Sequence, residues 1–110
     1  MKRVVVTGMA GITSLGETAD EIFAQFEQQK SGIQYMPEWE AYSDLRCKIA
    51  GPVTHFDVPK HFNRKVTRSM GRVALMSVVC AEKALADAQL MQHPILQSGD
   101  TGVAFGSSAG

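Results

Sequence analysis

The sequence lacks the features that mark several large classes of protein. It has only 2 cysteines among 110 residues, and neither lies in a CxxC or Cys/His pattern of the kind that binds zinc. Basic and acidic residues number 11 each, so no net charge attracts the chain to nucleic acid or to a membrane surface. Its longest strongly apolar run, VALMSVVCA, is far shorter than the about 20 residues that cross a bilayer. These absences leave a cytoplasmic globular protein as the expectation, with no metal, nucleic acid or membrane.

The cysteines and histidines show no catalytic pattern. Cys80 lies inside the apolar run and is expected to be a buried, inert thiol. Cys47 lies between two cations that could activate it, but no partner base can be assigned nearby. The histidines are expected in surface loops, without metal-ligand spacing: His55, His61 and His93. No catalytic role, metal or cofactor is assigned to any of them.

The first third of the chain predicts a strand, a glycine-rich turn and a helix. Residues 2–7 are rich in valine and are predicted as a buried strand. Thr18 and Glu21 have the spacing of a capping box, and apolar residues then recur at helical intervals. Gly32 fits the position just after the end of this helix.

The rest of the chain predicts a long helix and a second strand. Residues 64 to about 90 repeat apolar side chains every three or four positions, nearly all round the helix, so burial on most sides is expected. The ending TGVAFGSSAG predicts a strand that enters a second glycine- and serine-rich turn. Buried strands need cover on both faces. Residues 1–110 are therefore expected to be an undivided, incomplete portion of a larger α/β domain.

The first glycine turn does not have the spacing of a nucleotide site. Gly8, Gly11 and Gly16 follow G-x-x-G-x-x-x-x-G, whereas a dinucleotide fingerprint needs GxGxxG. A P-loop needs a lysine after its last glycine, and Glu17 stands there. A tight turn with close backbone contact explains the glycines better.

Four stretches, in order, resemble one family. RVVVTGMAGITSLG resembles the N-terminal signature of the β-ketoacyl-acyl carrier protein synthases, R-V-V-V-T-G-[LM]-G-x-[VIL]-[ST]-P-[LV]-G. KSGI, FDVPKHFNRKVTRSMGRVALMSVVCAEKALADA and TGVAFGSSAG resemble its later motifs, and the resemblance covers the whole chain. Four positions depart from the usual residues: Ala10, Gly11, Ser14 and Gly71.

The resemblance implies a fold and a reaction. The fold is α/β and thiolase-like, with αβαβα layers, of which residues 1–110 form the N-terminal portion. The enzyme is an elongating, synthase II-like acyltransferase that condenses an acyl chain with malonyl-carrier protein by decarboxylation, in fatty acid or polyketide and polyene synthesis. Its nucleophilic cysteine and two histidines lie beyond residue 110. Residues 1–110 are therefore expected to hold no catalytic residue and to be inactive alone.

The resemblance also implies partners and two sites. Acyl and malonyl carrier proteins are the expected partners, in a homodimer or a heterodimer with a ketosynthase-like subunit. Lys65 and Arg68 occupy positions that meet the acidic carrier protein in related synthases, and Arg64 is the next candidate. Arg64, Arg68 and Arg72 would share one face of a continuous helix. A simply solvated basic face remains open, whereas nucleic acid is disfavoured because aromatic residues are sparse there.

The second site is the final turn. Ala109 falls where related enzymes line the acyl pocket, although simple backbone geometry also explains the turn. A non-catalytic, ketosynthase-like docking or partner subunit is the alternative function. A short-chain dehydrogenase or reductase is a third, disfavoured by the glycine spacing and by the lack of a Tyr-x-x-x-Lys pair.

Overall fold

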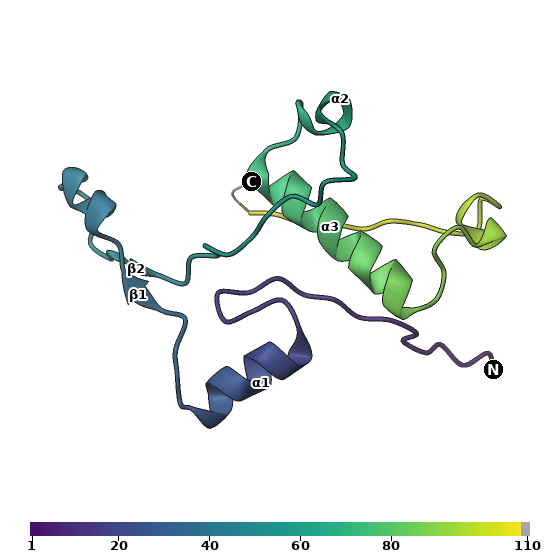
Figure 1. Ribbon diagram of the computed structural model, residues 1–110, viewed down its shortest axis with the longest axis horizontal. Coiled ribbons are helices and arrows are strands. Elements are labelled where there is room, and N and C mark those ends of the chain that lie inside the picture. The colour runs from purple at the N-terminus through teal and green to yellow at the C-terminus, as the bar shows by residue number, and fades with distance from the viewer. Residues whose placement is uncertain (109–110) are drawn as a thin grey trace. The chain divides into compact units, whose positions relative to one another are not determined.

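A computed structural model describes residues 1–108 (Figure 1). The chain divides into two compact units. One unit is Gly11–Phe56, and the other joins Met1–Ala10 to Asp57–Gly110. The elements in chain order are α1 (Ala19–Glu27), β1 (Gln34–Tyr35), η1 (Pro37–Ala41), β2 (Ile49–Ala50), α2 (Arg64–Thr67), α3 (Arg72–Asp87) and η2 (Pro94–Leu96). The expectation of an undivided domain across residues 1–110 stays a prediction.

The start of α1 confirms the predicted capping box. The Thr18 hydroxyl accepts the Glu21 N–H at 3.3 Å, and the Glu21 carboxylate accepts the Thr18 N–H at 3.0 Å. The same carboxylate accepts the Glu17 N–H at 2.8 Å. These backbone donors, Glu17 first and Thr18 second, favour the charged carboxylate and hold the pKa of Glu21 below its ordinary value.

The end of α1 does not use Gly32, so that prediction is wrong. Gln29 adopts a left-handed backbone with φ 54° and ends the helix. The N–H of Gln29 bonds to the carbonyl of Phe26 at 2.9 Å, and that of Lys30 bonds to the carbonyl of Gln25 at 2.9 Å. This is the Schellman pattern, which satisfies carbonyl groups that the helix leaves open.

A small hairpin follows α1 in the same unit. β1 and β2 pair antiparallel, with Gln34 opposite Ala50 and Tyr35 opposite Ile49. η1 lies in the connection between them (Figure 1), where Lys48 forms an ion pair with Glu40 at 2.6 Å. The sequence indicates short strand pieces around residues 46–50, and β2 at Ile49–Ala50 confirms one of them.

The second unit contains a broken helix where a continuous one is predicted. α2 ends at Thr67, and α3 begins after Gly71, whose backbone is extended at φ −71° and ψ 172°. The Gly71 carbonyl accepts the N–H of Leu75 at 3.0 Å and starts a new helix. The predicted single face of Arg64, Arg68 and Arg72 is therefore wrong, because Arg72 belongs to a different helix.

Both predicted strands of this unit lack strand pairing within residues 1–108. Residues 2–7 and 101–106 run without helix or strand (Figure 1), and Val4 and Val103 are 96% and 82% exposed. The expected burial of the long helix is also wrong for the described residues. Val79 is the one buried residue of α3, at 3% exposure, and Phe56 is the other buried hydrophobic side chain among residues 1–108. A strand needs a hydrogen-bonded neighbour, and an apolar face needs cover.

The N-terminal segment is nevertheless held against the end of α3. The Met9 N–H donates to the Asp87 carboxylate at 2.9 Å. Gly8 lies so close to the last turn that a Cβ there would come within 2.6 Å of the Ala88 nitrogen. The predicted role of this glycine in close backbone contact is confirmed.

Candidate functional site

Four cations lead into and through α2, and we call them the basic segment: Lys60, Arg64, Lys65 and Arg68. Asn63 caps the short helix, since its side-chain oxygen accepts the Val66 N–H at 3.0 Å. The cap sets the positions of Arg64 and Lys65, and the Arg68 N–H bonds to the Arg64 carbonyl at 3.0 Å. The chain thus places the sequence-predicted docking residues on one helical turn and its immediate continuation.

The basic segment has no acidic partner within residues 1–108. All four side chains are exposed, and the ion pairs of the described residues lie elsewhere. Arg72 is not part of the basic segment. It is the first residue of α3, and it lines an apolar hollow. Exposed cations without internal partners are free to attract an acidic surface, over distances of about 10 Å at 0.1 M salt.

One histidine ties this segment to α3. The His61 Nε2 atom lies 2.8 Å from Glu82 Oε1 and 2.9 Å from Glu82 Oε2. Beside this pair, a hollow of about 180 Å³ is lined by Pro59, Val79 and neighbouring residues of α3. Sequence reasoning missed the pair, because two residues far apart in the chain give no local signal.

An apolar hollow of about 680 Å³ lies at the start of α3. Its walls come from the helix start and from the C-terminal segment: Gly71, Arg72, Val73, Ala74, Ser77, Val78, Val103, Phe105, Gly106 and Ser107. The start of the predicted acyl-pocket turn, Gly106 and Ser107, is therefore part of it. Ala109, the residue named for that pocket, lies outside the described residues.

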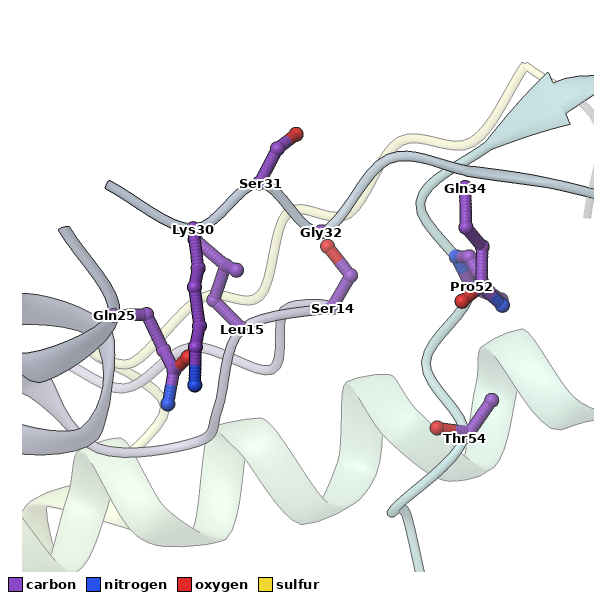
Figure 2. A pocket seen from close by; sticks show the side chains of 9 residues that line it. All are labelled: Ser14, Leu15, Gln25, Lys30, Ser31, Gly32, Gln34, Pro52 and Thr54. Carbon is purple, nitrogen blue, oxygen red and sulfur yellow. The ribbon is translucent and has the colours of Figure 1, made fainter. Parts of the chain in front are cut away.

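A polar hollow of about 370 Å³ lies in the other unit (Figure 2) and is lined by Ser14, Leu15, Gln25, Lys30, Ser31, Gly32, Gln34, Pro52 and Thr54. It brings together two of the stretches that carry the family resemblance, RVVVTGMAGITSLG and KSGI. Ser14 lies directly against Gly32, where a Cβ would come within 2.8 Å of the Ser14 Cβ. Gly32 therefore serves close packing and not the end of α1.

The cysteines remain without a catalytic partner. Cys47 is exposed, and its thiol lies 3.9 Å from the Ile49 carbonyl, while Cys80 is half-buried on α3 and not fully buried as predicted. Within residues 1–108, no three His, Cys, Asp or Glu side chains are grouped so as to hold a metal ion. The helices of this part of the chain are all too short or too polar to cross a membrane.

Comparisons with known proteins agree over the whole chain. The profile of the β-ketoacyl synthase N-terminal domain matches residues 1–110. The 3-oxoacyl-[acyl-carrier-protein] synthase 1 of Haemophilus influenzae is 32% identical over 110 residues, which are 100% of this chain and 26% of the relative. The synthase 2 of Synechocystis is 32% identical over 109 residues, which cover 99% of this chain and 26% of the relative.

A solved structure is similar as well. The crystal structure of a β-ketoacyl synthase from Burkholderia phymatum superposes on this chain with a TM-score of 0.90 at 44% identity. The superposition covers 98% of this chain and 26% of the solved one. The chain therefore spans about a quarter of the length of the relatives that it matches.

Proposed function

The chain belongs to the β-ketoacyl synthase family, and on that premise we propose that it forms the N-terminal part of a β-ketoacyl-acyl carrier protein synthase. The proposed reaction joins an acyl chain to malonyl-carrier protein with loss of carbon dioxide, in fatty acid, polyketide or polyene synthesis. The match of the family profile to all 110 residues is the observation that carries this proposal.

Within this reaction, the proposed task of residues 1–110 is to dock the carrier protein. Lys65 and Arg68 are the main contacts and Arg64 is the third. Their exposure and their lack of acidic partners in the described residues support this role. The resemblance implies an acidic carrier, whose charge complements the basic segment.

The proposal assigns no catalytic residue to residues 1–110. Cys47 and Cys80 match no nucleophile position, and residues 1–110 alone are expected to be inactive. We also propose that Ala109 lines the acyl pocket. Apolar residues just before it, Val103 and Phe105, line a hollow with α3, which supports this placement. A homodimer, or a heterodimer with a ketosynthase-like subunit, and a cytoplasmic location complete the proposal.

A condensation assay tests the proposed function. The complete encoded polypeptide is incubated with acyl-carrier protein and malonyl-carrier protein, and mass spectrometry follows the carrier-bound 3-oxoacyl product. Product formation is expected, and residues 1–110 expressed alone should form none. Carrier binding without product would favour the non-catalytic partner subunit. If the polypeptide neither binds the carrier protein nor forms product, the proposal is rejected.

A further inference from the structure

The contact between His61 and Glu82 has a consequence for the docking role of the basic segment. We propose that these two side chains form a clamp that positions the basic segment on α3, and that carrier binding strengthens when His61 is protonated. The inference rests on the proposed docking function. His61 and Glu82 act in it as positioning residues, since neither is assigned a contact with the reacting atoms.

The clamp is anchored to the most buried part of its unit. Glu82 stands one helical turn after Val79, which is 3% exposed, so both side chains lie on the same face of α3. The Glu82 side chain is 33% exposed, whereas that of His61 is 60% exposed. The Glu82 carboxylate is thus the more firmly held side chain of the pair. The loop before α2 places the His61 imidazole against it.

The loop that contains His61 leads directly into α2, so the position of His61 affects where α2 begins. The Phe62 N–H bonds to the Pro59 carbonyl at 3.0 Å and closes a turn around His61. The rings of His61 and Phe62 lie 4.5 Å apart between centroids, which limits their independent movement. Asn63, the cap of α2, follows directly. A shift of His61 therefore moves the helix start that carries Arg64 and Lys65.

Protonation changes the strength of the clamp. A neutral imidazole can donate one hydrogen bond to the Glu82 carboxylate, whereas the imidazolium adds a full positive charge to the same contact and turns it into an ion pair. Histidine ordinarily changes charge between pH 8 and pH 5. The charged residues beside it are Glu82 and Lys83 on α3, which line the same hollow, and Lys60, its neighbour in the chain. Of these, the Glu82 carboxylate is in direct contact with the imidazole.

The expected effect is modest, because an exposed ion pair changes an equilibrium by no more than about fivefold. We expect the complete encoded polypeptide to bind the carrier protein about threefold to fivefold more tightly at pH 6 than at pH 8. His61→Gln and Glu82→Gln should each abolish this gain, and the double variant should behave like either single one. His61→Lys should bind tightly at both pH values. His55→Gln, which changes an exposed histidine of the other unit, is the matched control and should keep the gain.

The variants separate the clamp from a simple charge effect. If Glu82→Gln keeps the gain while His61→Gln loses it, the charge of His61 acts without the clamp and the inference is wrong. A gain that survives in His61→Gln also overturns it, and both results leave the proposed docking intact.

Hydrogen exchange tests the clamp without the carrier. In the same polypeptide at pH 6, His61→Gln and Glu82→Gln should each speed exchange of the Phe62 and Val66 amides severalfold, because both amides are hydrogen-bonded in the clamped loop and helix. If the unmodified polypeptide binds no carrier, the docking proposal fails and this experiment alone decides on the clamp. Unchanged exchange in both variants would overturn it.

Discussion

Gly8 is a residue at which one added carbon atom decides the packing. A Cβ at this position would come within 2.6 Å of the Ala88 nitrogen and 2.8 Å of its Cβ, both inside normal contact distance. We expect Gly8→Ala to lower the free energy of unfolding by about 1–3 kcal/mol, because the last turn of α3 would have to move. Urea unfolding of the complete polypeptide measures the change.

Gly11→Ala is the matched control for this substitution. A Cβ at Gly11 has no neighbour within 4 Å, and its backbone is not left-handed. The control should change the free energy of unfolding by less than about 0.5 kcal/mol. Equal losses in the two variants would contradict the argument from close contact at Gly8.

Sequence reasoning predicted the tight turn at Gly16 and the close backbone contact at Gly8, but it assigned Gly32 the wrong role. Gly16 confirms the tight turn, with φ 152° and paired hydrogen bonds between Thr13 and Gly16. Gly32 was assigned to the helix end, but Gln29 takes the left-handed position there. A glutamine in that conformation carries no sequence signal, and the contact between Gly32 and Ser14 depends on the folded chain.

At the scale of the elements, the capping box at the start of α1 stabilises the folded state to an extent that depends on pH. Backbone N–H groups of Glu17 and Thr18 lower the pKa of Glu21, so its carboxylate stabilises the folded state above its ordinary pKa of 4.5. This contribution is lost as the pH falls through the lower pKa of the folded state. Glu21→Gln should therefore lower the thermal unfolding midpoint at pH 7, and the difference from the unmodified polypeptide should shrink as the pH falls below 4.5.

Glu27→Gln controls for the loss of a charge from the same helix. Glu27 is exposed at the C-terminal end of α1, where a negative charge is unfavourable next to the helix dipole. Its replacement should leave the midpoint at pH 7 unchanged or slightly raised. A loss as large as that of Glu21→Gln would show that net charge, not the capping box, sets the effect.

Local chemistry explains which elements the sequence predicts correctly. The capping box of α1 and the strand at Ile49–Ala50 depend on adjacent residues, and both were predicted. The break between α2 and α3 was not, because the apolar repeat continues across residues 68–71 while Gly71 adopts an extended backbone. The candidate docking residues were named by resemblance and stay a prediction, whereas the pairing of His61 with Glu82 depends on how the loop folds back on α3.

At the scale of the whole molecule, the α/β, thiolase-like fold class is confirmed by the similarity to a solved β-ketoacyl synthase. The two segments predicted as strands, residues 2–7 and 101–106, are still unpaired in the described residues, with Val4 and Val103 exposed. Apolar composition marks a segment that gains stability from burial, but the partner strand that buries it can lie anywhere in the chain. A sequence pattern therefore predicts the tendency of such a segment, and the pairing depends on its surroundings.

The proposed carrier docking involves the whole complex and should respond to charge and salt. We expect Lys65→Glu and Arg68→Glu each to weaken carrier binding by about fivefold to tenfold at low salt, and Arg64→Glu to have a smaller effect, because each variant places like charges face to face. The differences should shrink above about 0.5 M salt, where screening is strong. Arg46→Glu, which reverses an exposed cation of the other unit, should leave binding unchanged. Unaltered affinity of the Lys65 and Arg68 variants at low salt would rule out docking through the basic segment.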